Sequence, residues 1–430
     1  MELRAVKGMN DILPGEVERW QALESAFRTH VELHGYAEAR TPLLEHTALF
    51  ARQIGETTDV VEKEMYSFER HGDQLTVRPE GTAGFARAFV EHSIHAKQPT
   101  TRWYYMGPMF RGERPAKGRY RQFYQLGCEL YGDPGPLCDA EMIEMLASFL
   151  GKIGIGGIEI HLSSLGSGGT RERYREALRA YFTPIKEKLS EDSQRRLEKN
   201  PLRILDSKDP RDKEASAGAP SILELLGDDD RAHWDGLRAH LDALGVPYVV
   251  DPTLVRGLDY YTRTLFELRA TSSDLGSQNT LVGGGRYDNM IESLGGPKVP
   301  AIGFAAGMER LLISTNLGAE KRPSRCFVAP IGAAAVSRGL MLARDLRAAG
   351  IPTDIDGRGA SVKAMLRRAD SLGARFCLLL GEGELGRGVV QLKDLVARTQ
   401  EDVPLESAVK LTAERLAAPP PPADKGEAAR

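Results

Sequence analysis

The sequence predicts an α+β protein: a sheet domain interrupted by a helical insertion, followed by a smaller α/β domain. Three observations support this prediction. Residues 101–131 read as two strands joined by a charged loop, residues 168–247 are charged, helical and poor in aromatic residues, and strand and helix patterns alternate after Pro323. A chain of 430 residues is also too long for one compact core, so two or three domains are expected.

The sheet domain is predicted to span residues 1–322. A helix is expected over residues 17–33, where apolar residues recur at helical spacing between a proline and a glycine. The strand pair comes next, and a second helix is expected over residues 138–150. After the insertion, strand and glycine signals resume from about Leu254. The insertion therefore separates two halves of one sheet.

The smaller domain is predicted over residues 323–417. Strands alternate there with helices over 335–349 and 361–372, a rhythm that predicts a βαβ arrangement with a mostly parallel sheet. The remaining residues, 418–430, carry proline, alanine and charge but no core residues. They are predicted to be a disordered tail.

Composition limits the class of protein. The net charge of −3 argues against a uniformly basic protein but permits a local basic surface for nucleic acid. No apolar run is long enough to span a bilayer, and the N-terminal residues lack the apolar core of a signal peptide. The four cysteines are far apart and lack CxxC spacing, so reduced thiols in a cytoplasmic protein are expected, without disulfides or structural zinc.

The segment Arg111–Glu129 is the first candidate site. Its loop is basic, and the strand that follows alternates between two faces. Leu126 and its neighbours on one face suit a core, whereas Phe123, Gln125 and Glu129 share the other face. Gly127 leaves space among them, and a polar, partly aromatic face beside such a gap suits a ligand floor. The alternative is a solvated hairpin tip.

Three further segments are weaker signals when each is read alone. In Arg78–Gly84, Glu80 could hold an ammonium group and Thr82 could orient it, or Thr82 could simply cap a helix. The glycines of Val282–Gly296 permit close approach of a ligand or tight strand packing. In Ala301–Leu312, Arg310 could clamp a phosphate or lie on a helix surface.

Taken together, these segments resemble the signature of the class II aminoacyl-tRNA synthetases, and specifically the bacterial histidyl-tRNA synthetases. The resemblance covers residues 7 to 415, nearly the whole chain. The class motifs are matched by GYAEARTPLLE, FRGERPAKGRYRQFYQLGCE and AIGFAAGMERLL, and the histidine-specific motifs by RGLDYYTRTLFE and GGGRYDNMI. The N-terminal KGMNDILP and the insertion segment NPLRILDSKDP also resemble the family.

This resemblance implies an antiparallel sheet flanked by helices, a helical insertion and a C-terminal anticodon-binding domain. It implies a histidine–tRNA ligase of protein biosynthesis. Such an enzyme activates histidine with ATP to histidyl-adenylate and transfers the histidyl group to the 3′ end of tRNA(His). Histidine, ATP with Mg²⁺, and tRNA(His) are then the expected partners, without a prosthetic group. The family also implies a homodimer with the first motif at the interface, which fits a C₂ assembly.

The family motifs also imply roles for residues at the ATP site. Arg111 and Arg256 are expected to be catalytic and to contact the α-phosphate from two sides, with Arg256 at the position where the family uses an arginine in place of a metal ion. Arg310 is expected to hold the γ-phosphate end. Glu113 is expected to contact the adenine amino group, and Phe123 to stack on the ring.

The histidine pocket is expected to contain acidic, hydroxyl and aromatic groups around the amino group and the imidazole. A site that hydrogen-bonds both ring nitrogens can reject isosteres strongly, so no editing domain is required. The residues implied are Glu80, Gly81, Thr82, Gln125, Glu129, Tyr260 and Tyr261.

Recognition of tRNA departs from the family pattern at one position. Many bacterial members carry Gln where this chain has Ala116. That residue helps to read the extra 5′ guanosine of histidine tRNA. Either Arg114 or Lys117 reads it here, or the tRNA identity differs. In the smaller domain, Arg358, Lys363, Arg367 and Arg368 could meet RNA or could be solvated helix residues.

Two other functions are the alternatives to an enzyme: a non-catalytic paralogue and a tRNA-sensing module. A non-catalytic paralogue, such as the regulatory subunit of ATP phosphoribosyltransferase, usually lacks the anticodon domain and an intact RGLDYYT. A tRNA-sensing module would be expected to lose Arg111, Arg256 or Arg310. This chain retains all of these features, which favours the enzyme.

Overall fold

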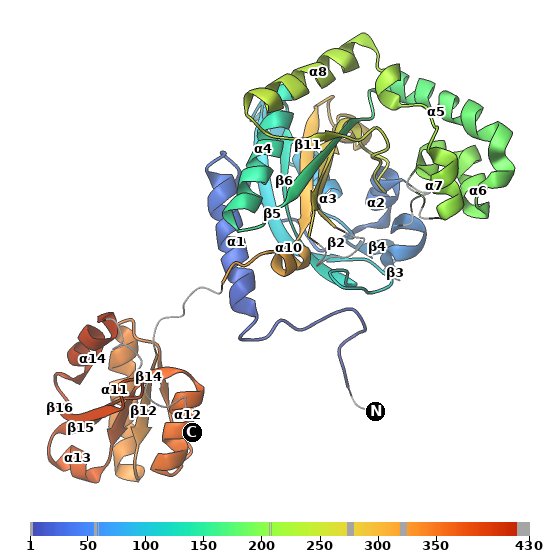
Figure 1. Ribbon diagram of the computed structural model, residues 1–430. Coiled ribbons are helices and arrows are strands. Elements are labelled where there is room, and N and C mark those ends of the chain that lie inside the picture. Colours follow the sequence, from blue (N-terminus) through green and yellow to red (C-terminus); the bar gives the residue numbers. More distant parts are fainter. Residues whose placement is uncertain are drawn as a thin grey trace, which may run out of the picture. The chain divides into compact units, whose positions relative to one another are not determined.

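The computed structural model describes residues 3–55, 58, 60–205, 207, 209–272, 279–318 and 325–418. The chain divides into two compact units, Met1–Glu320 and Lys321–Arg430 (Figure 1). The predicted tail, residues 418–430, lies outside the described residues except for Ala418. No described helix combines the length and the apolar character needed to cross a bilayer.

The large unit is built on one sheet, which has eight strands among the described residues. Neighbouring strands are antiparallel except at the two edges, where short strands pair in parallel. In spatial order the strands are β1 (Ala37–Glu38), β5 (Thr101–Phe110), β6 (Gln122–Tyr131), β11 (Ala301–Gly307), β10 (Thr280–Arg286), β9 (Thr262–Ala270), β7 (Ile158–Ser164) and β8 (Val249–Val250).

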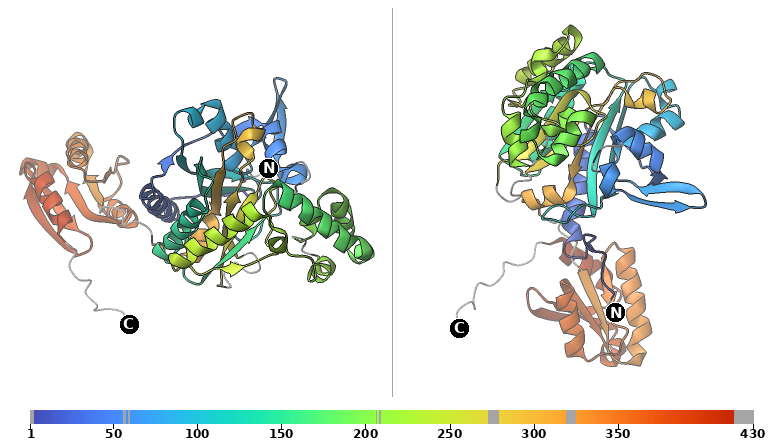
Figure 2. Two further views of the ribbon diagram at one scale, coloured as in Figure 1. Left: turned by 90° about the horizontal axis from the view of Figure 1, so that it is seen from above. Right: turned by 90° about the vertical axis from the view of Figure 1, so that its right-hand side faces the viewer.

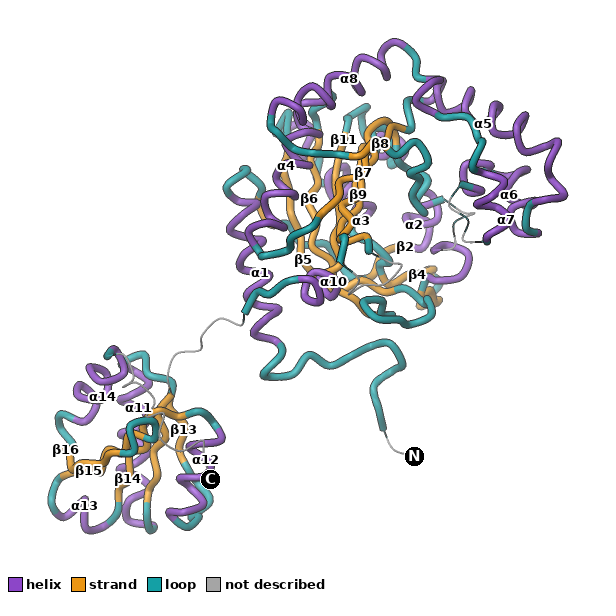
Figure 3. The backbone as a smooth tube through the Cα atoms, in the orientation of Figure 1, coloured by secondary structure: helices purple, strands orange, loops and turns teal. Residues whose placement is uncertain are grey.

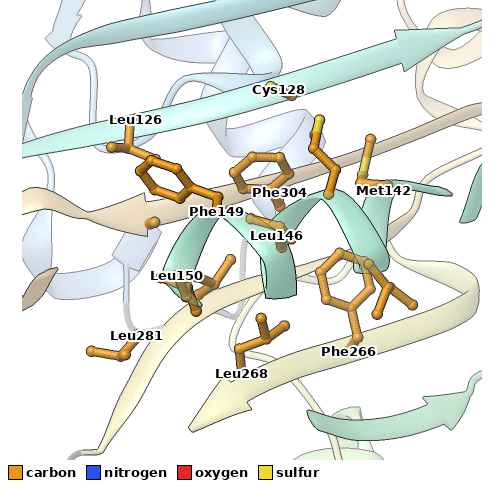
Figure 4. Close-up of a cluster of buried hydrophobic side chains, with 14 of the residues drawn as sticks. Leu126, Cys128, Met142, Leu146, Phe149, Leu150, Phe266, Leu268, Leu281 and Phe304 are labelled. Atoms are coloured by element: carbon orange, nitrogen blue, oxygen red, sulfur yellow. The ribbon is translucent and has the colours of Figure 1, made fainter. Parts of the chain in front are cut away.

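One face of this sheet carries the main apolar core. The helices α1 (Val17–Glu32), α4 (Pro136–Lys152) and α8 (Asp228–Ala243) contribute to it. Helix α10 (Met308–Ser314) also contributes and contacts α1. Figure 4 shows Leu146 and Phe149 of α4 among side chains of β6, β9 and β11. Because alternate residues of these strands are buried in this core, the residues between them point to the opposite face of the sheet.

The opposite face is covered only in part. Here α3 (Thr82–Glu91) packs its Ala86 and Phe89 beside Tyr131 and Tyr287, next to the short α9 (Met290–Ser293). A second, three-stranded sheet adjoins α2 (Thr47–Ile54), in the order β2 (Leu44–His46), β4 (Asp73–Val77) and β3 (Tyr66–Arg70). The β3–β4 hairpin projects from the body of the unit (Figure 2). The uncovered part of this face is where the cavity described below opens.

The insertion consists of α5 (Gly168–Phe182), α6 (Glu191–Lys199), α7 (Pro210–Ser216) and α8. Tyr174, Leu178 and Phe182 of α5 belong to a second apolar cluster, which also contains Tyr261 and Leu265. One buried carboxylate ties the insertion to the sheet: Asp230 of α8 accepts hydrogen bonds from Ser167 and Thr170 at the start of α5 and from Arg263 of β9. The insertion is therefore attached at the strand that also carries the RGLDYYTRTLFE motif.

The small unit has a sheet that is five-stranded in the described part of the chain, in the order β13 (Thr353–Ile355), β12 (Arg325–Pro330), β14 (Ala374–Leu380), β15 (Val389–Asp394) and β16 (Thr399–Pro404). It is flanked by α11 (Ala333–Ala348), α12 (Val362–Ser371), α13 (Glu382–Gly386) and α14 (Ala408–Ala417) (Figure 3).

The expectation of a mostly parallel sheet in this unit is wrong. Strand β12 pairs in parallel with β13 and β14, but β14–β15 and β15–β16 are antiparallel. The reason is local: β14 and β15 are joined by the short α13, and β15 and β16 by a tight turn, which suit antiparallel neighbours. The predicted fold class, with its antiparallel sheet, helical insertion and C-terminal α/β domain, is confirmed.

Candidate active site

A cavity of about 1130 Å³ opens on the sheet face opposite α4. Its floor comes from β6, β9, β10 and β11, and its walls come from the loop after β5, the start of α3 and the segment before β9. Ten predicted site residues line it: Glu80, Thr82, Arg111, Glu113, Phe123, Gln125, Arg256, Tyr260, Tyr261 and Arg310.

Strand β6 supplies the floor because its residues alternate between the two faces. Leu126, Cys128 and Leu130 are fully buried in the apolar core. Phe123 and Gln125 point the other way and line the cavity. Gly127 follows Gln125 on the same face of the strand and must be glycine, because a Cβ there would lie 2.5 Å from the ring of Tyr105 and from the backbone oxygen of Phe304. The strand pattern thus builds a ligand-sized hollow over a solid core.

Glu129 lies beneath this floor and is fully buried. Its carboxylate accepts a 2.7 Å hydrogen bond from the Thr82 hydroxyl and a second hydrogen bond from the Tyr287 hydroxyl. Burial raises the pKa of Glu129 to about 8, against the two donors, which act to lower it. The carboxyl group is therefore held protonated at neutral pH.

Glu80 caps the start of α3. Its carboxylate accepts hydrogen bonds from the backbone N–H groups of Thr82 (2.8 Å) and Ala83 (2.9 Å), so Glu80 caps this helix, whereas the hydroxyl of Thr82 points to Glu129. The pKa of Glu80 is raised, chiefly by burial. Gly81 does not line the cavity; it lies between the two residues, where a Cβ would lie 2.6 Å from the ring of Tyr105.

Arg111 begins the loop after β5. Its Nε donates to the backbone oxygen of Pro79 at 2.9 Å, and its guanidinium carbon lies 5.3 Å from the centre of the Phe123 ring. These two contacts leave the terminal nitrogens facing the cavity. An arginine fixed in this way can present a bidentate fork to phosphate or carboxylate oxygens.

Arg256 faces the same cavity from the segment before β9. Its Nη1 pairs with the Glu267 carboxylate, and its guanidinium lies across Gly283 of β10, where a Cβ would come within 2.3 Å of Nη2. Burial acts to lower the pKa of Arg256, but Glu267 and the neighbouring tyrosines raise it above its ordinary value. Its charge is therefore permanent.

Arg310 projects from the first turn of α10. Its Nη1 donates to the Thr280 backbone oxygen at 2.7 Å, and its Nε donates to the Gly118 backbone oxygen at 3.2 Å. Burial and the nearby arginines lower its pKa. Three arginines from three separate segments thus line one cavity and can meet an anion there, and acidic residues such as Glu113 and Glu267 line the same cavity.

The loop after β5 is held by two further contacts. Glu113 pairs with Arg119 at 3.0 Å, and Ala116 and Arg119 form an isolated β-bridge. Arg114 and Lys117 are exposed at the tip and do not line the cavity.

The N-terminal segment supports the same loop from behind. The backbone oxygen of Gly8 accepts hydrogen bonds from the N–H groups of Arg121 (2.7 Å) and Gln122 (3.2 Å). Gly8 has a φ of +84°, and a Cβ there would lie 2.9 Å from Pro115. Glycine suits both the left-handed backbone and the close approach. The KGMN segment is therefore a packing support of the loop that carries Arg111 and Glu113.

Tyr260 and Tyr261 close one side of the cavity. Their ring centres are 4.6 Å apart, and Tyr260 also packs edge-on against Tyr287 at 5.7 Å. Tyr287 lines the cavity and was not among the predicted site residues, although it lies within the GGGRYDNMI segment. Its hydroxyl reaches Glu129, so the aromatic wall and the buried acid form one unit.

Several other lining residues were not predicted. Glu267 and Arg269 of β9 face the cavity, while Phe266 and Leu268 face the core. This alternation of charged and apolar residues was the available signal. Glu309, at the start of α10, accepts from the Tyr124 backbone N–H at 2.9 Å, and burial raises its pKa to about 7.

A buried ion pair involves Arg286, the last residue of β10, next to Tyr287. Arg286 is fully buried, and its Nη1 donates to Asp139 of α4 at 2.5 Å. Asp139 also accepts from the hydroxyl of Thr264 and pairs with the ring of His233 on α8 at 2.9 Å. The pKa of Asp139 is lowered despite its burial, chiefly by Arg286. This network links β9, β10, α4 and the insertion helix α8.

Sequence models of two protein families match the chain. The model described as "Histidyl-tRNA synthetase" matches residues 8–168 and 175–311, and the model described as "Anticodon binding domain" matches residues 325–415.

Two curated relatives are similar over nearly the full length. The "Histidine--tRNA ligase" of Sorangium cellulosum is 69% identical, covering 99% of this chain and 100% of the relative. The protein of the same name from Syntrophotalea carbinolica is 47% identical, covering 94% and 97%.

Two solved structures share the fold of this chain. Apo histidyl-tRNA synthetase from S. aureus has a TM-score of 0.79 at 34% identity, covering 95% of this chain and 99% of the other. A Bacillus halodurans structure described as an ATP phosphoribosyltransferase regulatory subunit/histidyl-tRNA synthetase has a TM-score of 0.63 at 22% identity, covering 89% and 99%, and shows the fold alone.

Proposed function

The chain belongs to the histidyl-tRNA synthetase family and is a histidine–tRNA ligase, and we propose that the cavity above β6 is where histidine reacts with ATP. The observation that carries this proposal is that Arg111, Arg256 and Arg310 line the same cavity as Glu80, Thr82 and Gln125. The arginines suit the phosphates, and the carboxylate, hydroxyl and amide suit an amino acid with a polar ring.

In the first step, an oxygen of the histidine carboxylate attacks the α-phosphorus of ATP. A phosphorus–oxygen bond to pyrophosphate breaks, and histidyl-adenylate forms. Negative charge builds on the phosphate oxygens, so fixed positive groups lower the barrier. Arg111 and Arg256 have this role in the proposal, and the tether of Arg111 to Pro79 supports it because a pre-oriented donor needs no reorganisation.

The rest of ATP is assigned by the same reasoning. Arg310 holds the γ-phosphate end, and its two backbone contacts fix its direction. Phe123 stacks on the adenine ring, and the Arg111 guanidinium lies against the ring of Phe123. The Glu113 carboxylate accepts a hydrogen bond from the adenine amino group. Its present partner is Arg119, so binding ATP requires Glu113 to share its carboxylate or to exchange partners.

Histidine occupies the part of the cavity between α3 and the tyrosines. Glu80 and Thr82 face its amino group, with Gly81 between them, and Gln125, Tyr260 and Tyr261 face its ring, with Glu129 supporting this part of the site from beneath the floor. Gln125 supports this assignment, because within the described residues its side-chain oxygen is buried without a hydrogen-bond partner. A buried acceptor of this kind is costly until a ligand N–H reaches it.

Mg²⁺ enters this proposal as a companion of ATP, held mainly by phosphate oxygens and water. The described residues contain no group of three His, Cys, Asp or Glu side chains arranged to hold a metal. Acidic residues that line the cavity, such as Glu113 and Glu309, could contact water molecules bound to the ion.

In the second step, a ribose hydroxyl at the 3′ end of the tRNA attacks the histidyl carbonyl carbon, and AMP leaves. Arg114 and Lys117 are proposed to meet the acceptor end, since both are exposed at the loop tip. The small unit is proposed to bind the anticodon through basic residues on and near α12. Two of these, Arg358 and Arg368, pair with Asp356 at 3.0 and 3.4 Å and are thereby oriented. We further propose a homodimer in the cytoplasm.

The test is ATP–pyrophosphate exchange with each standard amino acid, followed by aminoacylation of tRNA(His). Exchange with histidine alone, and charging of that tRNA, are expected. Absence of exchange with any amino acid would instead support a non-catalytic role.

A further inference from the structure

Glu267 is a cavity-facing carboxylate on β9 that no step of the reaction described above requires. Its side chain is only 9% exposed. It pairs with Arg256, accepts from Nε of Arg269 at 2.8 Å, and accepts from the Thr280 hydroxyl at 3.1 Å. Its neighbours Phe266 and Leu268 point into the core, so the strand holds this carboxylate rigidly at the cavity wall.

Arg256 depends on Glu267 for its direction. Among the described residues, Glu267 is the one hydrogen-bond acceptor that the Arg256 guanidinium reaches, and Arg256 Nε is buried without a partner. The guanidinium lies against Gly283, where a Cβ would come within 2.3 Å of Nη2, so a side chain at that position would displace it. Arginine has many rotamers of similar energy, so a guanidinium held at one nitrogen would otherwise sample several positions.

Thr280 connects the Glu267–Arg256 pair to Arg310, the proposed ligand of the γ-phosphate end of ATP. Its hydroxyl donates to Glu267, and its backbone oxygen accepts from Arg310 at 2.7 Å. Glu267 therefore fixes Arg256 directly. It also accepts from Thr280, the first residue of β10, whose backbone oxygen holds Arg310. Both arginines are the proposed phosphate ligands.

We propose that Glu267 is a positioning residue for adenylation, which holds the Arg256 guanidinium in the orientation that meets the α-phosphate as charge develops on it. This inference rests on the proposed function, because it presupposes that Arg256 contacts the phosphate. Glu267 itself touches neither ATP nor histidine in this proposal. Its effect should therefore appear only when Arg256 is present.

A double-mutant cycle on the full-length protein tests this dependence. ATP–pyrophosphate exchange is measured for the wild type, Glu267→Ala, Arg256→Ala and the double variant, with kcat and the KM values for ATP and histidine determined separately. Arg256→Ala alone should lower kcat by roughly 10²–10³-fold, as expected for loss of one charge-stabilising donor. Glu267→Ala should lower kcat by roughly tenfold with little change in KM for histidine.

In the Arg256→Ala background, Glu267→Ala should cost less than about twofold further, because its target is gone. Glu267→Gln keeps an oxygen that can accept from Arg256, so it should retain more activity than the alanine variant. It is also nearly isosteric and serves for the cycle if Glu267→Ala fails to fold. Asp394→Ala is the matched control, since it removes a similarly buried carboxylate paired with Arg375 at 3.7 Å in the small unit; its exchange activity should be that of the wild type.

Two results would overturn the inference: an unchanged kcat in Glu267→Ala, or the same fold-loss in the presence and absence of Arg256. An unchanged kcat in Arg256→Ala would instead refute the proposed role of Arg256, and the positioning role would fall with it. The single variants thus distinguish failure of the proposed function from failure of the inference.

Discussion

The Thr82 hydroxyl donates a 2.7 Å hydrogen bond to the carboxyl group of Glu129, which joins the start of α3 to the buried end of the cavity floor. Glu129 is an acid whose burial raises its pKa to about 8. In the unfolded chain the same group ionises near its ordinary value of 4.5. Raising the pH from about 4.5 to about 8 therefore favours the unfolded chain, and the lost stability is at most about 1.4 kcal/mol per pH unit.

Glu129→Gln should consequently raise the melting temperature more at pH 8.5 than at pH 5, because the amide never ionises. The KM for histidine should increase, since the proposed ring contact is altered. Thermal unfolding followed across this pH range, together with exchange kinetics, provides the check. A melting-temperature difference that stays constant with pH would contradict the assignment of this pKa.

Gly283 and Gly284 offer a pair of neighbouring substitutions with different expected effects. The three atoms nearest to a Cβ on Gly283 would all belong to the guanidinium of Arg256, whereas a Cβ on Gly284 would lie 2.5 Å from both the backbone oxygen of Gly303 and the ring of Phe266. Gly283→Ala should displace Arg256 and lower the adenylation kcat by roughly tenfold or more, with a small change in melting temperature.

Gly284→Ala should mainly destabilise the large unit, because backbone and core atoms cannot give way cheaply. Pyrophosphate exchange and thermal unfolding of both variants, measured side by side, separate the two effects. Equal losses of stability would show that the space at Gly283 serves packing and not Arg256.

Asp139→Ala should be strongly destabilising. It removes the fully buried carboxylate partner of Arg286 and leaves the partly exposed Asp288 to pair with that buried arginine, and breaking a buried pair from one side costs about 3–5 kcal/mol. The free energy of unfolding of the large-unit transition in denaturant titration is the measurement. Asp345→Ala, which removes an exposed carboxylate paired with Arg344, is the control and should change it by less than about 0.5 kcal/mol.

Arg114→Ala and Lys117→Ala should reduce tRNA charging while leaving pyrophosphate exchange near the wild-type rate, because both side chains are exposed at the loop tip, outside the cavity. The measurement is aminoacylation of transcripts with and without the extra 5′ guanosine. If either residue reads that nucleotide, its variant should discriminate less between the two transcripts. Equal discrimination in both variants and the wild type would point to a different tRNA determinant, and Ala116→Gln then tests whether the usual family residue restores discrimination.

The sequence predicted those parts of the structure that local patterns encode. The alternation in β6 identified Phe123, Gln125 and Glu129 as one face, and the structure has them on the side away from the core. In the small unit, the strands β12 to β15 and the helices α11 and α12 also follow in the order that periodicity predicted. Roles for single residues came from the family resemblance and stay predictions.

What the sequence did not reveal depends on distant partners or on weak local signals. Nothing near Asp139 predicts that Arg286, 147 residues away, neutralises it. Glu267 stood within a quoted motif, but its role as a partner of Arg256 appears only when β9 and the preceding segment are placed together. Strand β16 was missed because its residues are mostly polar and exposed; it pairs along one edge of the small sheet.

The contact between Gly8 and the loop after β5 has a practical consequence for anyone who handles this protein. Trimming the chain past Gly8 would remove the acceptor of the Arg121 and Gln122 N–H groups and loosen a loop that holds Arg111. A preparation nicked near its N-terminus would still look folded on a gel-filtration column while its specific activity had fallen.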